Sequence, residues 1–287
     1  MLKQPNIKRS LEIKLNLITP HLYQRQIVDS CLDPSIFFTV AVVGRQFGKT
    51  CIAENLVTYW GVNEANVKIM WVSPTDSQAQ KVQAEIVSAI HHSGVIKSSK
   101  KSKGDTEIRF HNGSVILFRS AASEDSLRGE SIHYLVIDEA AFVKREIIEG
   151  ILMPMLNVVG RHCLFITTPK GKNYIYEYYQ KGLTTSKWRS LRFSTLYSPL
   201  ANPELLQLFK DTLPPKLYQQ EIEAEFVDSS SDLFASDIFT ISVSLFNLSF
   251  SSLVGFSIIV NLRTSPIRSE RSFNLLMILS LVISIFF

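Results

Sequence analysis

Residues 37–50 read FFTVAVVGRQFGKT, and this stretch decides the fold. Its first half, Phe37–Val43, is a run of mostly apolar and β-branched residues, which is typical of a strand buried on both faces of a sheet. Its second half is a glycine-containing loop that leads into a helical stretch, Lys49–Trp60. A strand, such a loop and a helix in this order are the local architecture of a phosphate-binding site.

The loop carries the residue types that bind phosphate. Such a loop needs small residues that let backbone N–H groups approach the oxygens, a Lys for the phosphates and a hydroxyl for Mg²⁺. Gly48, Lys49 and Thr50 supply them, although the first Gly of the common pattern is displaced by one, because Val43 stands in its place. The alternative is an ordinary strand-to-helix turn. We predict a nucleotide-binding loop made of Gly44, Arg45, Gln46, Phe47, Gly48, Lys49 and Thr50.

The chain beyond this loop alternates buried strands with helices. Apolar strand patterns recur at Val67–Ser73, His133–Asp138 and Cys163–Thr168, and helical patterns at Ser77–His92, Lys144–Leu156 and Tyr174–Gly182. Asn112 and Gly113 predict a hairpin turn between two short strands, because both residues accept positive φ. This order of elements predicts an α/β fold with a doubly wound, mainly parallel sheet.

Two further segments stand apart from that alternation. Asn202–Phe226 contains three Pro residues and predicts a small helical unit. Lys97–Lys103 (KSSKKSK) predicts a solvated basic surface loop, with a DNA contact as the alternative.

Carboxylates and hydroxyls follow two of the buried strands. In a doubly wound sheet, ligands bind at the carboxyl ends of the strands, so Asp138 and Glu139 converge on the loop. There Asp138 would hold Mg²⁺ and Glu139 would polarise the attacking water. The alternative is a helix N-cap with an acidic first turn. Thr167 and Thr168, followed by Pro169, end the next strand, where the hydroxyls would sense a γ-phosphate.

The composition excludes several classes of protein. With 46% hydrophobic residues the chain is too apolar to be disordered, and its 287 residues have room for one large α/β domain and a fragment of another. Cys31, Cys51 and Cys163 form no CxxC pair, so a disulfide scaffold or Cys-based zinc site is not expected. The formal net charge of +4 permits an anionic partner without identifying one.

The C-terminal part has a different character from the rest. After Asp232 the charged residues are Asp237, Arg263, Arg268, Glu270 and Arg271. The run Phe273–Phe287 (FNLLMILSLVISIFF) is uncharged but shorter than the roughly 20 apolar residues of a spanning helix. We therefore expect an aberrant apolar tail and no stable membrane partner, with a tail anchor as the alternative. The polar, basic N-terminus shows no signal peptide.

Four motifs together resemble the ATPase domain of the large terminase subunit of tailed bacteriophages. GRQFGKT resembles the deviant Walker A motif of that family, and Ser126–Phe142 (SLRGESIHYLVIDEAAF) resembles its Walker B region. Phe165–Gly171 (FITTPKG) resembles its coupling motif, and Leu22–Arg25 (LYQR) its adenine motif. The resemblance covers about residues 20–256. It implies a P-loop NTPase of the RecA-like (ASCE) type with a small helical lid subdomain, using ATP and Mg²⁺.

The resemblance also implies roles for single residues. Lys49 would neutralise the phosphates, Thr50 and Asp138 would ligate Mg²⁺, and Glu139 would activate water. Gln24 would read adenine, with a helix-surface side chain as the alternative, and Arg45 would lie along the phosphates. Arg128 would act as an arginine finger toward a neighbouring subunit, with an ion pair to Glu124 or Asp125 as the alternative. Thr167, Thr168 and Pro169 would couple hydrolysis to movement of the lid.

The chain departs from the family after the lid. We expect a lead-in at residues 1–19, the ATPase core at 20–200 and the lid or linker at 201–228. Residues 229–256 resemble the start of an RNase H-like nuclease, and 257–287 look foreign to it. Ser257 stands where the family has an Asp, and too few carboxylates remain for a two-metal nuclease. A frame slip near Phe256 would explain the change.

The implied function is an ATP-driven motor that moves double-stranded DNA into a procapsid, with its nuclease activity lost. Its expected partners are DNA, a portal protein and a small terminase subunit, in a homo-oligomeric ring in the host bacterial cytoplasm. The alternatives are a non-functional truncated prophage remnant and a superfamily 2 helicase, although no second RecA-like region is visible after residue 228.

Overall fold

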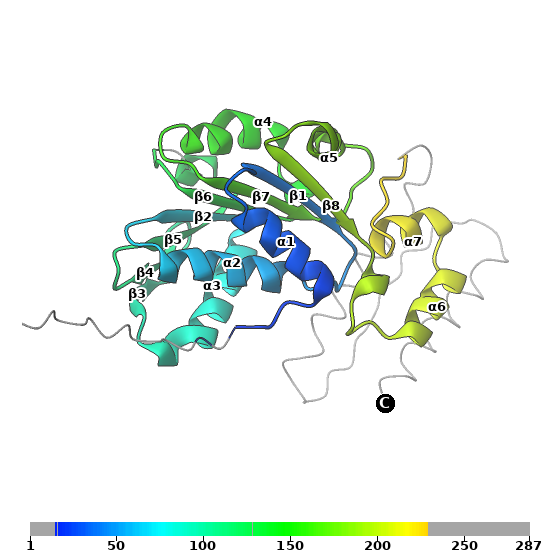
Figure 1. Ribbon diagram of the computed structural model, residues 1–287, viewed down its shortest axis with the longest axis horizontal. Coiled ribbons are helices and arrows are strands. Elements are labelled where there is room, and N and C mark those ends of the chain that lie inside the picture. The colour runs from blue at the N-terminus through cyan, green and yellow to red at the C-terminus, as the bar shows by residue number, and fades with distance from the viewer. Residues whose placement is uncertain (1–14, 16, 128, 229–287) are drawn as a thin grey trace, which may run out of the picture. The chain divides into compact units, whose positions relative to one another are not determined.

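The computed structural model describes residue 15, residues 17–127 and residues 129–228 (Figure 1). Most of the expected lead-in and both expected C-terminal segments, 229–256 and 257–287, lie outside these residues. The described residues fall in one of the two compact units of the chain, Met1–Ala235.

The described strands form one eight-stranded sheet in the order β3-β4-β5-β2-β6-β7-β1-β8. The strands are β1 Phe38–Val43, β2 Lys68–Ser73, β3 Ile96–Lys100, β4 Thr106–Phe110, β5 Val115–Ser120, β6 Tyr134–Asp138, β7 His162–Thr167 and β8 Trp188–Phe193. All pairings from β5 to β8 are parallel, whereas β3 and β4 run antiparallel at one edge. The predicted mainly parallel sheet and its hairpin are therefore confirmed.

Helices cover both faces of this sheet, which confirms the doubly wound arrangement. On one face lie α1 Leu22–Leu32, α2 Lys49–Asn63 and α3 Asp76–Ile90 (Figure 1). On the other lie α4 Arg145–Ile147 and α5 Tyr174–Thr184. Because every side chain of β6 and β7 is buried, alternate residues enter two separate cores, such as Val136 in one and Ile137 in the other. This two-sided burial is why these strands read as continuous apolar runs.

The local signals at helix ends match the observed boundaries. Thr75 caps α3 with a capping box to Gln78, and Asn173 caps α5 by accepting a hydrogen bond from the Ile175 N–H. Asn202 caps α6 Pro203–Thr212, whose first residue is a Pro. With α7 Pro215–Glu221, α6 forms the predicted helical unit around a small core of Leu206, Tyr218 and Ile222.

Three local features differ from the sequence-based expectations. The predicted loop Lys97–Lys103 is wrong over residues 97–100, because β3 covers Ile96–Lys100, whereas residues 101–103 belong to no helix or strand. The predicted exposure is confirmed, since Lys and Ser suit a solvated edge strand. The predicted helix Lys144–Leu156 is broken into α4, a π-turn at Ile148–Leu152 and a 3₁₀ turn at Met153–Leu156, which contains Pro154. Strand β8 has no counterpart among the predicted elements, because its half-exposed edge position leaves no strong apolar pattern.

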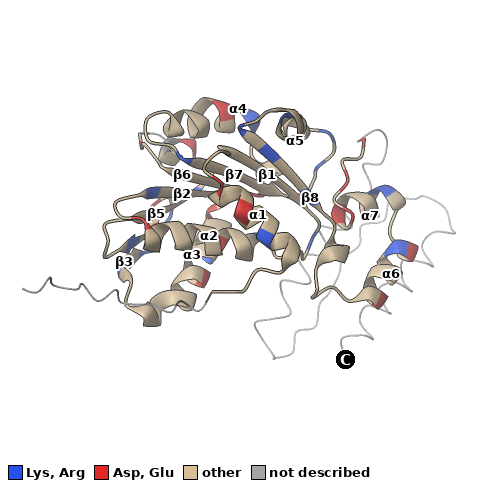
Figure 2. Ribbon diagram, in the orientation of Figure 1, with Lys and Arg blue, Asp and Glu red and all other residues tan. Residues whose placement is uncertain are grey.

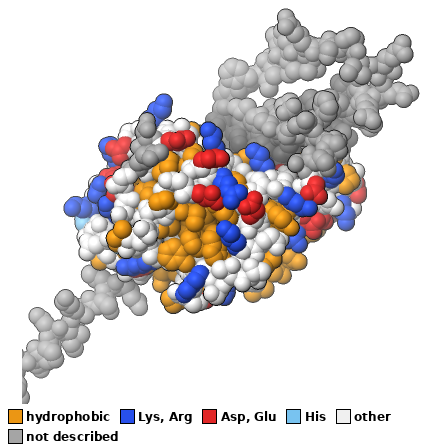
Figure 3. Space-filling view, turned by 90° about the horizontal axis from the view of Figure 1, so that it is seen from above, with side chains coloured by type: hydrophobic (Ala, Val, Ile, Leu, Met, Phe, Trp, Pro, Cys, Tyr) orange, Lys and Arg blue, Asp and Glu red, His pale blue; other side chains and the backbone are white. Residues whose placement is uncertain are grey.

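The surface carries mixed charge and one visible apolar area. Figure 2 shows Lys, Arg, Asp and Glu spread over the outer elements, with both signs on α6. Seen from the side of α4 and α5, apolar side chains gather in the middle of the face and charged side chains border them (Figure 3). Among the described helices, none has the length and apolar character that a membrane crossing requires.

Candidate functional site

The predicted loop lies at the carboxyl end of β1 and is held in a strained, close-packed shape. Gln46 and Gly48 have left-handed φ angles of 57° and 86°. A Cβ on Gly44 would lie 2.3 Å from Thr195 Oγ1 and 2.5 Å from the Ile222 carbonyl oxygen, so only Gly fits there. Gly48 is the N-cap of α2 and has no side-chain cap, so the first N–H groups of the helix point into the loop without a side-chain acceptor.

Two charged residues from different elements meet at this loop. Lys49 Nζ lies 3.0 Å from Glu139 Oε1, and both side chains are largely buried, with 13% and 21% of their surface exposed. Glu139 follows β6 directly and has a left-handed φ of 51°. Its second oxygen, Oε2, is buried and has no hydrogen-bond partner among the described residues. The carboxylate is thus positioned with one oxygen on a cation and the other available to a ligand.

Asp138 ends β6 beside this pair and is only 6% exposed. Its Oδ1 accepts a hydrogen bond of 3.1 Å from the Glu139 N–H. Burial and, secondly, the charge of Glu139 raise the pKa of Asp138 to about 7, while Lys49 opposes this rise. Ionising a buried carboxyl is energetically costly unless a cation lies nearby, and a bound divalent metal ion would supply that cation. Asp138 is therefore suited to be a metal ligand.

The donor set suits Mg²⁺ better than a metal bound by protein alone. Within the described ranges no group of three or more His, Cys, Asp or Glu side chains could hold a metal ion. Mg²⁺ commonly takes one or two protein oxygens and completes its shell with phosphates and water. Asp138 and Thr50, at the start of α2, offer such oxygens beside the loop.

Glu54 is a half-buried carboxyl that none of the sequence motifs includes. It lies one helical turn after Thr50 on α2, and burial raises its pKa to about 9, with further contributions from its hydrogen bond to Glu85 and from the charges of Glu85 and Asp138. The four-residue spacing from Thr50 was the available signal, because it places both side chains on one helix face.

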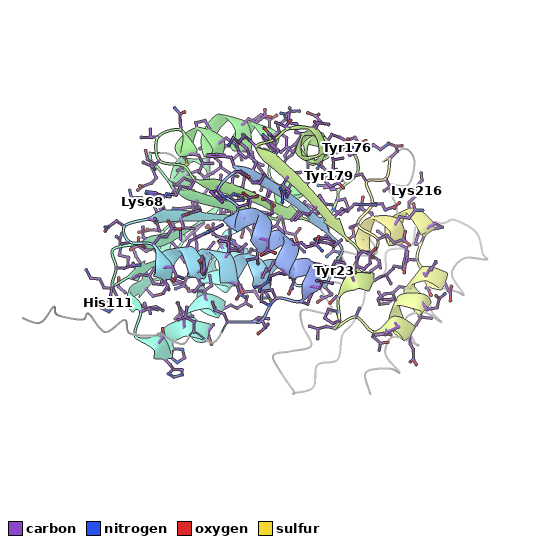
Figure 4. The ribbon with its side chains drawn as sticks, in the orientation of Figure 1. Tyr23, Lys68, His111, Tyr176, Tyr179 and Lys216 are labelled. Atoms are coloured by element: carbon purple, nitrogen blue, oxygen red, sulfur yellow. The ribbon has the colours of Figure 1, made fainter. Side chains whose placement is uncertain are left out.

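Gln24 also lies at the loop, through α1. Its Nε2 donates to the carbonyl oxygens of Phe47 and Gly48 at 3.2 and 3.3 Å, and its Oε1 accepts from the His21 N–H at 3.1 Å. Gln24 is 6% exposed, so it is not a helix-surface side chain. Nearby, Tyr23 stacks on Tyr197 with ring centroids 4.5 Å apart; Tyr23 is labelled at the end of α1 in Figure 4.

Arg45 connects the loop to the lid. Its Nε forms an ion pair with Glu221 Oε2 at the end of α7, and its N–H donates to the Glu221 carbonyl oxygen at 2.8 Å. Thr195 Oγ1 donates to the Arg45 carbonyl oxygen at 2.7 Å. The sequence pointed to phosphates as the partner of Arg45, whereas these lid contacts join residues far apart in the chain.

Thr167 and Thr168 lie between the carboxylates and the lid. Both are buried at the end of β7, and Thr167 Oγ1 accepts from the Ala141 N–H at 3.2 Å. Beyond Pro169, the Gly171 N–H donates to Gln220 Oε1 of α7 at 3.0 Å. This segment therefore touches the turn after Glu139 at one end and the lid at the other.

The segment that follows α7 packs against α5. Phe226 lies with its ring centroid 5.1 Å from that of Tyr176 and 5.4 Å from that of Tyr179, two residues labelled along α5 in Figure 4. Lys172 and Asp228 form an ion pair at 2.9 Å. Arg128, the predicted finger, lies outside the described residues, so its role and the alternative ion pair stay predictions.

Comparison with known proteins identifies the family. A family model described as "Terminase large subunit, T4likevirus-type, N-terminal" matches residues 40–241. The terminase large subunit of Escherichia phage T5 is 32% identical over 221 residues, which cover 76% of this chain and 50% of that protein. Tripartite terminase subunit 3 of Elephantid herpesvirus 1 is 29% identical over 114 residues, covering 40% of this chain and 17% of that protein. The chain thus spans about half the length of the phage T5 relative and a smaller share of the herpesvirus one.

Solved structures show the same fold. The large terminase ATPase domain of Thermus phage P74-26 superposes with a TM-score of 0.62 at 22% identity, covering 73% of this chain and 94% of that one. The large terminase of a thermophilic bacteriophage, in complex with ATP-γ-S, gives a TM-score of 0.59 at 12% identity, covering 72% and 52%. These likenesses confirm the predicted α/β fold with a doubly wound, mainly parallel sheet. The chain belongs to the family of terminase large subunits, T4likevirus-type, and matches its N-terminal part.

Proposed function

We propose that this chain is the ATP-hydrolysing part of a DNA-packaging motor that moves double-stranded DNA into a procapsid. The observation that carries the proposal is the contact of 3.0 Å between Lys49 and Glu139, which joins the loop after β1 to the carboxylate after β6. The family, and the ATP-γ-S and ADP complexes of the large terminase from the thermophilic bacteriophage, support a nucleotide as the ligand.

The roles of the site residues follow from their chemistry. The backbone N–H groups of Gln46, Phe47 and Gly48 and the Lys49 ammonium bind the phosphates. Asp138 and Thr50 would hold Mg²⁺, which when bound neutralises charge on the phosphate oxygens. As Lys49 turns to the phosphate, Glu139 loses its ion-pair partner and is free to accept a proton from the attacking water.

Recognition and coupling use the neighbouring contacts. Gln24 reads the adenine through its amide, close to the loop carbonyls that it already contacts. Arg45 lies along the phosphates when nucleotide is present, which requires it to leave Glu221. Thr167, Thr168 and Pro169 then pass the change to the lid, which they reach through Gly171 and Gln220. Arg128 acts on the nucleotide of a neighbouring subunit.

The proposed organisation keeps the expected boundaries. Residues 20–200 would form the ATPase core, 201–228 the lid, 229–256 the start of a nuclease domain and 257–287 an apolar tail. The motor works as a homo-oligomeric ring in the host bacterial cytoplasm, on a portal protein and with a small terminase subunit.

Steady-state phosphate release by the full 287-residue chain tests the proposal, with Glu139→Gln as the site variant. A general base contributes about 10² to 10⁴ in rate, so we expect Glu139→Gln to lose at least roughly 100-fold in kcat. The exposed Glu146→Gln serves as the matched control and should keep the wild-type rate. Equal rates for wild type and Glu139→Gln would refute the motor and favour a non-functional remnant.

A further inference from the structure

Glu139 is held in a backbone conformation that it would not adopt by itself. Its φ of 51° lies in the left-handed region, which is unfavourable for a residue other than glycine. Such strain persists only where the surrounding structure fixes the backbone. The short 3₁₀ turn Ala140–Phe142 begins at Glu139, so whatever holds this turn also sets the direction of the Glu139 side chain.

The turn is held by the segment that leads into α5. The Tyr174 hydroxyl lies 2.5 Å from the carbonyl oxygens of both Ala140 and Val143, at the two ends of the turn. Asn173 Nδ2 donates to the Ala141 carbonyl oxygen at 3.2 Å.

The hydroxyl of Tyr174 is suited to a fixed donor role. Burial raises the pKa of Tyr174, so the hydroxyl keeps its proton over the whole working range. Its ring packs edge-on against that of Tyr178, 5.6 Å away, which limits its movement. One proton shared by two carbonyls draws the ends of the turn together, a geometry that a Phe ring cannot reproduce.

We propose that Tyr174 is a positioning residue for Glu139, because its hydroxyl closes the turn that holds the carboxylate against Lys49. The proposal rests on the proposed catalytic role of Glu139. Loss of the hydroxyl lets the turn relax and the carboxylate shift relative to the reacting water, while the phosphate-binding loop keeps its own contacts. A misplacement of about 1 Å at a reacting group can cost about 10²-fold in rate.

The chain offers a matched control one turn further along the same helix. The Tyr178 ring is 1% exposed, and its hydroxyl donates to Glu149 Oε1 at 2.7 Å, away from the turn. Tyr178→Phe removes the same atom from the same helix and costs a buried hydrogen bond. It reports on stability alone.

The test compares kcat and KM for ATP in full-length Tyr174→Phe, Tyr178→Phe and wild type, with thermal unfolding of each. We expect kcat of Tyr174→Phe to fall at least tenfold with KM within twofold, and Tyr178→Phe to stay within twofold in both. Asn173→Asp is a second variant: it keeps the oxygen that caps α5 but loses the donor to Ala141, and should lower kcat in the same way.

A double-mutant cycle distinguishes the positioning role of Tyr174 from the catalytic role of Glu139. In the Glu139→Gln background, Tyr174→Phe should cause no further loss, because the positioned group is already gone. If Glu139→Gln matches the wild type, the proposed function itself is wrong. If Glu139→Gln is inactive while Tyr174→Phe and Asn173→Asp retain kcat, or Tyr178→Phe loses as much as Tyr174→Phe, the positioning role is wrong and the function stands.

Discussion

Lys49 Nζ and Glu139 Oε1 lie 3.0 Å apart, so the cation of the loop after β1 is paired with the proposed base. The pair also balances charge, because Asp138 lies beside it and is almost fully buried. The ion pair thus contributes to the stability of the folded protein as well as to the proposed chemistry of the site.

Lys49→Gln should lower both nucleotide binding and stability. Removing the cation leaves two neighbouring carboxylates without compensation, and we expect a loss of about 1–3 kcal/mol in the free energy of urea unfolding. The double variant Lys49→Gln, Glu139→Gln should recover much of this stability, because it removes one of the two stranded carboxylates. A double variant less stable than Lys49→Gln would contradict the charge-balance explanation.

Asp138→Asn should stabilise the nucleotide-free protein at neutral pH. The pKa of Asp138 is about 7 in the folded protein and near 3.8 when unfolded, so the folded state binds more protons between these values. Its contribution to stability therefore falls as pH rises from about 4 to 7, by about 1 kcal/mol per pH unit.

Urea unfolding of Asp138→Asn without nucleotide or Mg²⁺ should lack this decline and meet the wild-type curve below about pH 4. The exposed Asp29→Asn variant is the matched control for the loss of one carboxylate. If the Asp138→Asn and wild-type curves run parallel, the buried carboxyl is not the source of the pH dependence.

His162 should act in the opposite direction. It is 2% exposed, its Nδ1 lies 3.2 Å from the Ile36 carbonyl oxygen, and its Nε2 has no partner among the described residues. Burial lowers the pKa of His162 to about 4, so the unfolded chain binds the extra proton between about pH 4 and 6.5. Stability is present in full above about pH 6.5 and is lost as pH falls toward about 4.

His162→Gln keeps a side-chain donor and removes the titration. We expect it to be less stable than the wild type at about pH 7, but to lose less stability between about pH 6.5 and 4. Chemical unfolding at several pH values measures both, and an acid-side slope unchanged from the wild type would rule out His162 as its cause.

Gly44→Ala should disrupt the junction between the loop and the lid. Its Cβ would meet Thr195 Oγ1 and the Ile222 carbonyl oxygen, and the second of these is backbone that cannot rotate away. We expect a loss of more than about 2 kcal/mol in unfolding free energy and weaker ATP binding. Gly150→Ala is the control, since its added Cβ meets nothing within 4 Å. Equal stability of the two variants would show that the junction tolerates the added atom.

The central strands and the loop could be predicted because their signals are local. Phe37–Val43 and His133–Asp138 are apolar on both faces, and GKT follows the first of them. Edge elements gave weaker signals: β3 reads as a polar loop and β8 has no clear alternation. Pro154 was visible in the sequence, yet the change from α-helix to π and 3₁₀ turns depends on packing against the sheet.

The sequence predicted which residues form the site, but not which of them contact one another. Lys49, Asp138 and Glu139 were chosen from motifs, and the structure brings Lys49 and Glu139 together. The ion pair of Arg45 with Glu221 joins residues 176 positions apart, and no local pattern announces it. The left-handed backbone of Glu139 was equally hidden, and the hydrogen bonds to the turn after it come from a segment beyond the next strand.

Strand β7 lies between β1 and β6, so the loop and the carboxylates are not on neighbouring strands. Two inter-strand spacings amount to about 9–10 Å, and this distance separates the end of β1, which leads into the loop, from the end of β6, which leads into Glu139. Adjacent strands would separate them by about half of this distance. The inserted strand β7 therefore separates the loop from the carboxylates, and it ends in two buried residues that carry hydroxyl groups, Thr167 and Thr168.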